Sequence, residues 1–145
     1  MNLADLQRTL ENVLATGKLG TPVALRIHAA VPDVNPLKVL GVFSPLVGLI
    51  CNDSRGKLQA QSHSSGGQLS VLWTDAQGRS VLISAVSVPK CRQNMHILLI
   101  GNHGVTRLSG GELWSEPLSA DQSCPWEEEI RESLKTGTSI AVGLS

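Results

Sequence analysis

Histidines at short spacing can hold a metal ion, so the spacing of the histidines in this chain decides whether a metal site is expected. There are four, at His28, His63, His96 and His103. Their separations fit neither an HxxxH nor an HxH pattern. His28 and His96 fall on the same face of the predicted sheet and could meet in space, but neither strand supplies a carboxylate. We predict no metal site and interpret this pair as polar residues of an interface.

Nucleophilic and acid–base catalysis also lack a recognisable pattern. The chain has three cysteines, Cys51, Cys91 and Cys124. They have no CxxC spacing, which argues against a zinc ribbon or a disulfide framework and favours reduced, partly buried thiols. No serine lies in a GxSxG elbow. The acidic run Glu127–Glu129 is explained by the start of a helix, whose positive dipole end favours carboxylates.

The remaining candidate is a glycine-rich segment that resembles a phosphate cradle. Residues 101–104, Gly-Asn-His-Gly, follow a predicted strand, but they open no helix and lack the GxGxxG pattern. We interpret them as a turn. The sequence therefore predicts no catalytic, cofactor-binding or metal-binding residue, no cofactor, and a protein that is not an enzyme.

Length and composition indicate one domain, residues 1–145. Twelve basic residues balance twelve acidic ones, which gives no electrostatic reason to expect nucleic acid or an anionic membrane as a partner. The N-terminal residues lack the pattern of a signal peptide. The longest apolar stretch, residues 37–51, is shorter than the ~20 residues that cross a bilayer. We expect a soluble, cytoplasmic protein.

Helices are predicted at both ends and in the apolar middle. One apolar stripe at helical spacing is formed by Leu3, Leu6, Leu10, Val13 and Leu14, with Asn2 as N-cap and Gly17 as the left-handed residue at the end. Residues 37–51 favour a buried helix kinked near its proline, with two short strands as the alternative. The closing helix has Ser123 as cap, Pro125 in its first turn, Gly137 at its end, and an apolar stripe of Trp126, Ile130 and Leu134.

Alternating β-type runs separated by turns predict the rest. The predicted strands are Val23 to Ala30, Lys57 to His63, Gln68 to Thr74, Ser80 to Val88, Asn94 to Ile100, Val105 to Leu108 and a short Glu112 to Ser115. The fold class that follows is α+β: an open, mostly antiparallel sheet of five to seven strands with about three helices packed on one face.

The predicted sheet has two apolar faces, because alternate side chains of a strand point to opposite sides. The face that the helices can cover carries Leu69, Val71, Trp73, Val81, Ile83, Met95, Ile97 and Leu99. The opposite face mixes aliphatic and polar residues, and we take it as a candidate oligomer interface formed by Arg26, His28, Leu72, Thr74, Leu82, Ser84, Val86, His96 and Leu98.

Three helices are too few to cover both sides of such a sheet, and each aliphatic side chain left in water forgoes roughly 1.5–3 kcal/mol. Another protein surface is the expected cover, most simply a second copy of this chain in a twofold dimer, or in a tetramer. The alternatives are that the first strand and loops curl over this face, or that scattered apolar residues stay exposed.

Four segments resemble the C-terminal domain of Gfo/Idh/MocA oxidoreductases. Leu14 to Val23 is similar to the end of its first helix and the start of its first strand, with Arg26 following. The hairpin turn Asp75-Ala76-Gln77-Gly78 resembles its middle strands, and Leu99 to Leu108 resembles its GxxG strand pair. Trp126 to Gly137 is similar to its late helix. The resemblance spans nearly the whole chain and implies an open sheet whose free face forms a subunit interface.

The resemblance also has departures. The family's nucleotide-binding domain, with its glycine-rich turn and catalytic lysine, has no counterpart in the sequence. The family places an Asp and a His four residues apart after the first strand, whereas Asn35 to Cys51 contains neither, and Lys38 is its only charged residue. Hydride transfer needs a nicotinamide held against a proton donor.

Three functions remain open at this stage. The first is a non-catalytic oligomerisation, scaffold or partner-binding module related to oxidoreductase C-terminal domains, with a separate dehydrogenase as a possible partner. The second is a small-molecule binding protein with a pocket between the sheet and the kinked apolar segment. The third is one subunit of a split NAD(P)-dependent oxidoreductase.

Overall fold

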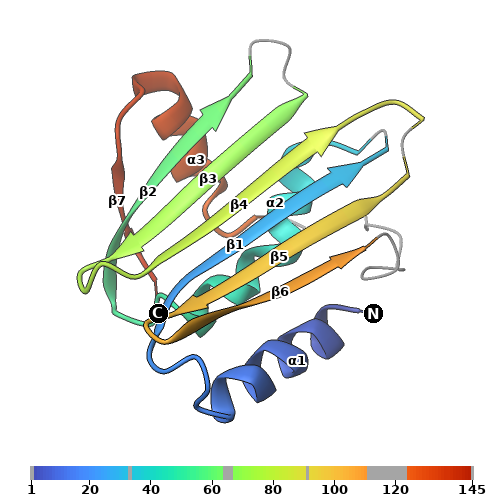
Figure 1. The fold of residues 1–145 in the computed structure, drawn as a ribbon. Helices are drawn as coiled ribbons and strands as arrows, with labels where there is room; N and C mark the ends of the chain where they lie inside the picture. Colours follow the sequence, from blue (N-terminus) through green and yellow to red (C-terminus); the bar gives the residue numbers. More distant parts are fainter. Residues whose placement is uncertain (1, 33, 64–66, 91, 111–123, 145) are drawn as a thin grey trace.

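A seven-stranded sheet organises the molecule (Figure 1). This computed structural model describes residues 2–32, 34–63, 67–90, 92–110 and 124–144. The strands are β1 (Pro22–Val31), β2 (Arg55–Ser62), β3 (Gln68–Asp75), β4 (Ser80–Ser87), β5 (Asn94–Gly101), β6 (Gly104–Gly110) and β7 (Ile140–Gly143). Their spatial order is β6-β5-β1-β4-β3-β2-β7. The pair β1–β4 is parallel and the other pairs are antiparallel, so the predicted sheet is confirmed.

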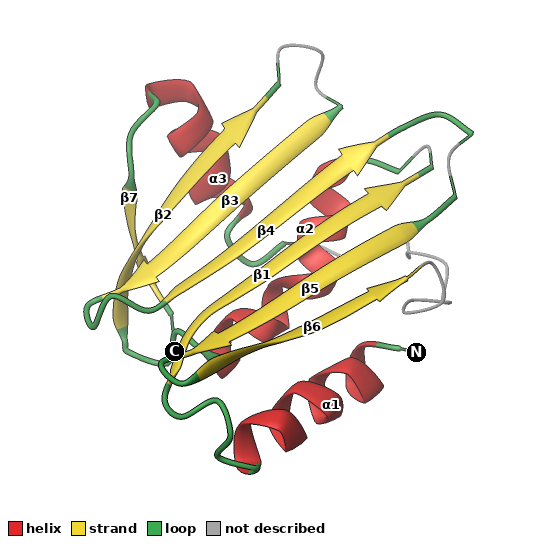
Figure 2. Cartoon of the chain, viewed as in Figure 1, coloured by secondary structure: helices red, strands yellow, loops and turns green. Residues whose placement is uncertain are grey.

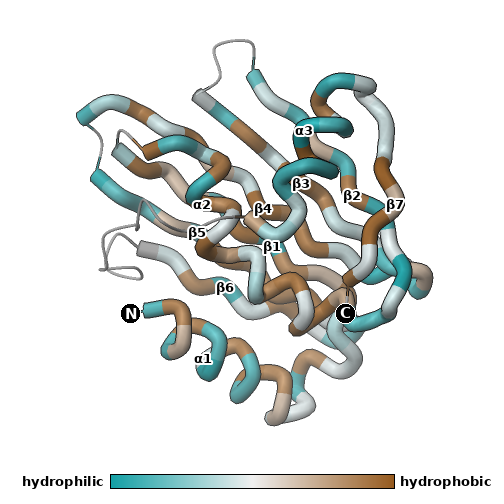
Figure 3. Tube along the Cα trace, turned by 180° about the vertical axis from the view of Figure 1, so that it is seen from behind, coloured by the Kyte–Doolittle hydropathy of each residue, from teal (hydrophilic) through white to brown (hydrophobic). Residues whose placement is uncertain are grey.

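The helices lie behind the sheet as viewed in Figure 2, except for the first one, which runs along the β6 edge. They are α1 (Leu3–Ala15), α2 (Pro36–Phe43), the 3₁₀ helix η1 (Ser44–Leu49) and α3 (Glu127–Thr136). Figure 3, which views the molecule from behind, shows α2 and α3 in front of the strands. The α+β class with helices on one face is therefore confirmed.

Helix α1 begins and ends as its sequence predicts. The Asn2 side chain accepts a hydrogen bond from the Asp5 amide at 2.8 Å, and the Asp5 carboxylate accepts one from the Asn2 amide, which completes a capping box. Gly17 follows the helix with a φ of 74°, the left-handed region that favours glycine. Leu6 and Leu10 are buried in the core.

The apolar middle segment is helical throughout, so the two-strand alternative is wrong. Asn35 caps α2 by accepting from the Leu37 amide at 3.0 Å, and Pro36 occupies the first turn. Ser44 and Pro45 open the 3₁₀ helix η1, so the helix changes type where the kink was predicted. Proline cannot donate the backbone hydrogen bond that a continuing α-helix needs.

The C-terminal part differs from prediction. Helix α3 begins at Glu127, with Trp126 as its N-cap residue and no side-chain cap, so Pro125 precedes the helix instead of lying in its first turn. Ser123 and the predicted strand Glu112 to Ser115 lie outside the described residues. Gly137 ends α3 with a φ of 71°, as predicted. Strand β7, which pairs with β2, was not predicted.

The core lies between the sheet and the helices. All eight side chains assigned to the covered face are buried: Leu69, Val71, Trp73, Val81, Ile83, Met95, Ile97 and Leu99. The two-residue period of the strands is thus read correctly from the sequence.

Candidate functional site: the open face of the sheet

The other side of the sheet carries no helix in the described chain, and we call it the open face (Figure 1). It is the side on which the register places Arg26 of β1 beside Leu82 of β4 and Leu98 of β5. All nine predicted interface residues lie at its positions. Four are exposed, namely Arg26, His28, Leu72 and His96; five are half-buried, namely Thr74, Leu82, Ser84, Val86 and Leu98. No strand or loop of the described chain covers them.

An aliphatic row crosses the centre of the open face. Leu98 pairs with Arg26, Arg26 with Leu82, and Leu82 with Leu72, so the row runs over four adjacent strands. Leu72 keeps 38% of its surface in water. Toward the β6 edge the row of Ile100 and Val105 adds apolar area, and Val105 is 50% exposed. The result is an apolar surface that one cation, Arg26, interrupts.

A polar row runs beside it. His28 and His96 are direct cross-strand partners, so the predicted meeting of these two histidines is confirmed. Asn94 lies 3.2 Å from the His96 Nε2 atom, and the hydroxyls of Ser70 and Ser84 hydrogen-bond to each other at 2.8 Å. The described residues contain no group of three or more metal-ligating side chains. With two imidazoles and two hydroxyls that hydrogen-bond to each other, this row forms a hydrophilic margin beside the aliphatic row.

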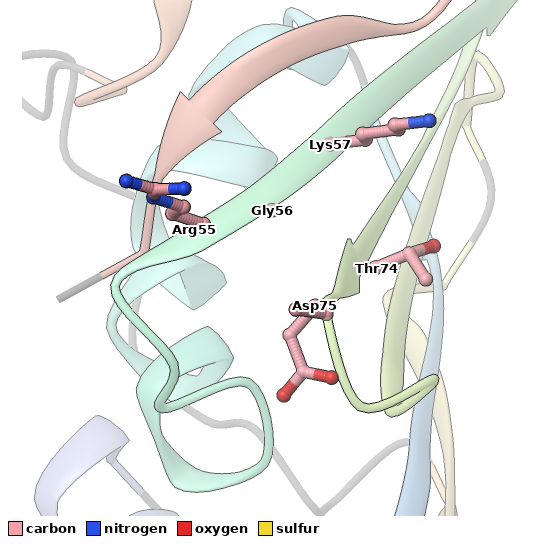
Figure 4. Close-up of a pocket in the computed structure, with 6 residues that line it drawn as sticks. Arg55, Gly56, Lys57, Thr74 and Asp75 are labelled. Carbon is pink, nitrogen blue, oxygen red and sulfur yellow. The ribbon is translucent and has the colours of Figure 1, made fainter.

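Two hollows indent the open face near β2 and β3. One of about 180 Å³ is lined by Gln59, Gln61, Ser70, Leu72 and Leu82, and is large enough for one side chain of a partner. The other, of about 350 Å³, lies at the strand ends and is lined by Arg55, Gly56, Lys57, Thr74, Asp75 and Ala76. Figure 4 shows Lys57 and Thr74 pointing to one side there, with the Asp75 carboxylate turned away.

That carboxylate stabilises the hairpin between β3 and β4. Asp75 Oδ1 accepts from the amides of Gln77 and Arg79 at 2.9 and 3.0 Å, and Oδ2 accepts from Arg79 Nε at 2.7 Å. The Asp75 side chain is 0% exposed, and Arg79 neutralises its charge, so the carboxylate is not available to a ligand. Asp75 therefore has a structural role in the turn that the sequence predicts at 75–78.

The cysteine thiols described by the structure are poor nucleophiles. Burial, and then the charge of Asp75, raises the pKa of the Cys51 thiol to about 11. Burial also raises the pKa of the Cys124 thiol. A thiol reacts as the thiolate, so both groups are nearly inert at neutral pH. Cys91 lies outside the described residues.

The glycine segment 101–104 is the turn between β5 and β6, as interpreted from the sequence. Asn102 Oδ1 accepts from the Thr21 amide at 2.8 Å, and the His103 amide donates to the Leu19 carbonyl at 2.9 Å. The turn therefore anchors the chain that enters β1, and its polar groups are used internally.

The sequence missed several members of the open face. Lys57, Gln59 and Gln61 of β2 and Arg107 of β6 lie on it by register. Alternation within residues 57–61 and 105–107 was the signal available, because each second residue of a strand shares a face.

None of the described helices is long and apolar enough to cross a membrane.

Comparisons with known proteins find the same fold in solved dehydrogenases. A myo-inositol dehydrogenase from Corynebacterium glutamicum superposes with a TM-score of 0.66 at 10% identity, over 93% of this chain and 60% of that one. A myo-inositol 2-dehydrogenase from Lactobacillus plantarum gives 0.62 at 10% identity, over 94% and 61%. The Lactobacillus casei myo-inositol dehydrogenase, solved with NAD(H) and myo-inositol, gives 0.58 at 15% identity, over 88% and 44%.

These likenesses concern the fold alone, and the chain spans about 60% of the length of the first two enzymes. The resemblance to the C-terminal domain of such oxidoreductases is confirmed at that level. No family model matches the sequence, and no curated protein matches it.

Proposed function

We propose that this protein is a non-catalytic assembly module that packs the open face of its sheet against another protein surface. The observation that carries the proposal is the uncovered row of Leu98, Leu82 and Leu72. Burying an aliphatic side chain contributes about 1.5–3 kcal/mol, so a partner that covers this row gains substantial free energy. The module is related in fold to dehydrogenase C-terminal domains, with a separate dehydrogenase among its possible partners.

The non-catalytic character rests on the chemistry available. Residues 35–51 carry neither the Asp nor the His that the resembled family uses after its first strand. Ser70 and Ser84 hydrogen-bond to each other, with no base beside either hydroxyl in the described contacts. The buried thiols of Cys51 and Cys124, with their raised pKa, fit a reducing compartment, and we place the protein in the cytoplasm.

The proposal is tested by the mass of the complexes that the chain forms. Light scattering over about 1–100 μM gives the mass of the pure protein, and gel filtration of native cell extract gives the mass of its complexes. Leu82→Asp and Leu98→Asp should each weaken assembly at least tenfold, which corresponds to about 1.4 kcal/mol. Leu134→Asp is the matched control, because Leu134 is 36% exposed on α3 and lies off the open face.

Either a self-assembled oligomer or a larger complex in extract supports the proposal, provided that Leu82→Asp loses it and Leu134→Asp keeps it. A chain that stays monomeric both when pure and in extract contradicts it. The dimer or tetramer that the sequence suggests stays a prediction, which light scattering of the pure protein checks.

A second candidate, one subunit of a split oxidoreductase, is favoured by the fold shared with an enzyme solved with NAD(H) and myo-inositol. In that case a nucleotide-binding partner supplies the lysine and the nicotinamide. Mixing the chain with a purified partner dehydrogenase should then produce NAD(P)-dependent activity that neither protein has alone. Equal activity with and without this chain counts against that candidate.

A small-molecule site is the third candidate. A cavity of about 240 Å³ lies between the start of α2, helix α3 and the ends of β2 and β3. It is lined by Asn35, Pro36, Leu37, Ser62, Gln68, Leu69, Ile130, Arg131 and Leu134. A bound metabolite would raise the free energy of unfolding by RT ln(1 + [L]/Kd), and a thermal-shift screen detects the resulting rise in melting temperature.

A further inference from the structure

The open face is positively charged although the whole chain is neutral. Register places the cations Arg26, Lys57 and Arg107 on it. In the described residues the seven strands contain one carboxylate, Asp75, and that group is buried and paired with Arg79. The cations of the open face therefore have no carboxylate of their own strands as a partner.

The acidic side chains lie elsewhere in the described chain. They are on α1 (Asp5 and Glu11), before β2 (Asp53) and on α3 (Glu127, Glu128, Glu129 and Glu132). Helices α2 and α3 lie on the opposite side of the sheet, and α1 lies along its β6 edge (Figure 2). The helices also carry cations, namely Arg8, Lys38, Arg131 and Lys135, so the helix side holds both signs of charge. The open face, in contrast, has cations and no carboxylate from the described strands.

A second copy is a poor occupant of such a surface. Two open faces in contact would bring cations toward cations, and Arg26 lies inside the apolar row between Leu98 and Leu82. A guanidinium buried without an anionic partner costs several kcal/mol, because it loses water and gains no counter-charge. The apolar row favours a protein partner, and the charge disfavours an identical one.

We propose that the open face binds an acidic surface of a different protein, one that presents carboxylates among aliphatic side chains. This inference rests on the proposed function of the face as an assembly surface. Arg107 and Arg26 flank Leu98 in one row, so carboxylates of the partner can pair with both guanidinium groups while an aliphatic residue packs on the leucine between them. The hollow beside Leu72 and Leu82 receives one further side chain.

Nucleic acid fits this surface less well. Single strands bind by stacking their bases on aromatic side chains, and the open face has none in the described strands. Trp73, the aromatic residue of those strands, points to the covered face and is buried. A phosphate backbone laid on the row of leucines would also remove them from water without packing against them.

The test uses a charge-reversed copy of the protein as a defined acidic probe. The variant Arg26→Glu/Lys57→Glu/Arg107→Glu keeps the apolar row and changes the sign of the face. We expect wild type and variant each to be monomeric alone at about 50 μM, and to associate when mixed. The association should weaken at least tenfold when NaCl rises from about 50 to about 500 mM, because salt screens exposed charges.

The control has the same net charge with an unchanged open face: Lys18→Glu/Lys38→Glu/Lys135→Glu, whose positions lie in the loop after α1 and on α2 and α3. Mixing it with wild type should give no complex. All variants are first checked for an unchanged circular dichroism spectrum and melting temperature.

Three outcomes overturn the inference. A wild-type dimer already formed at about 1 μM, and lost in Leu82→Asp, would show that the face binds its own copy; the proposed function would then stand while the acidic partner falls. Tighter binding to duplex DNA of about 20 base pairs than to the charge-reversed copy would favour nucleic acid. The absence of any complex in the mixture up to about 100 μM would also refute it, and the extract experiment with Leu82→Asp then decides separately whether the face assembles at all.

Discussion

At the scale of single residues, Cys51 shows how burial removes chemistry from a reactive side chain. Its Sγ atom donates to the Arg79 carbonyl at 3.4 Å, and the residue is 0% exposed beneath the β3–β4 hairpin. Burial is the main cause of its raised pKa, and the Asp75 charge adds to it. The thiol is therefore a small apolar filler of the core with a weak hydrogen bond.

This raised pKa makes the protein less stable in alkali. The unfolded thiol loses its proton near an ordinary pKa of 9.0 and the folded one near 11, so the unfolded state is favoured progressively between these pH values. Well below pH 9 the Cys51 thiol is protonated in both the folded and the unfolded state, so the stability that its burial contributes is fully present there. Between pH 8 and about pH 10.5, wild type should lose about 2 kcal/mol more free energy of unfolding than Cys51→Ala, measured by urea denaturation. Parallel pH profiles for the two proteins would contradict this.

At the scale of elements, the β5–β6 turn is held against the chain that enters β1. A Cβ atom added at Gly101 would overlap the backbone carbonyl of Leu19, which cannot move aside as a flexible side chain can. We expect Gly101→Ala to lower the free energy of unfolding by about 2–3 kcal/mol and the melting temperature by several degrees.

Gly104 in the same turn provides the matched control. A Cβ there would meet only the Leu19 Cδ2 atom at 3.5 Å, an ordinary contact, and its φ is not positive. Gly104→Ala should therefore melt close to wild type in the same thermal scan. Equal destabilisation by both variants would show that the turn conformation, and not the approach of Leu19, sets the need for glycine.

The sequence predicts these elements well where the signal is local. The two-residue period assigned both faces of the central strands, and the caps Asn2 and Gly137 marked helix ends. Strand order depends on contacts between residues far apart in the sequence, and no pattern within residues 22–31 indicates that β1 lies between β4 and β5. The four residues of β7 are too short for a periodic signal, and they become a strand because β2 offers them an edge.

At the scale of the whole molecule, the candidate interface was predicted as a set of residues but not as a charged surface. Arg26 was assigned to the open face, whereas Lys57 and Arg107 were not, because their segments were recognised as strands without a side assigned to each residue. Balanced totals of twelve basic and twelve acidic residues also hide that the open face carries cations without a carboxylate from its own strands. The pairing of β1 with β5, and of β5 with β6, is what brings Arg26 and Arg107 into one row.

The central position of the first strand has a consequence for how the protein reaches its native state. Both neighbours of β1 lie far along the chain, at Ser80–Ser87 and Asn94–Gly101, so its hydrogen bonds to β4 wait until residue 87 has left the ribosome, and those to β5 until residue 101 has. The hairpins β2–β3 and β3–β4 close short loops and can form earlier. High contact order of this kind gives refolding in milliseconds to seconds. During synthesis β1 is therefore an unpaired apolar strand, and it is the segment of the nascent chain that a chaperone would be expected to hold.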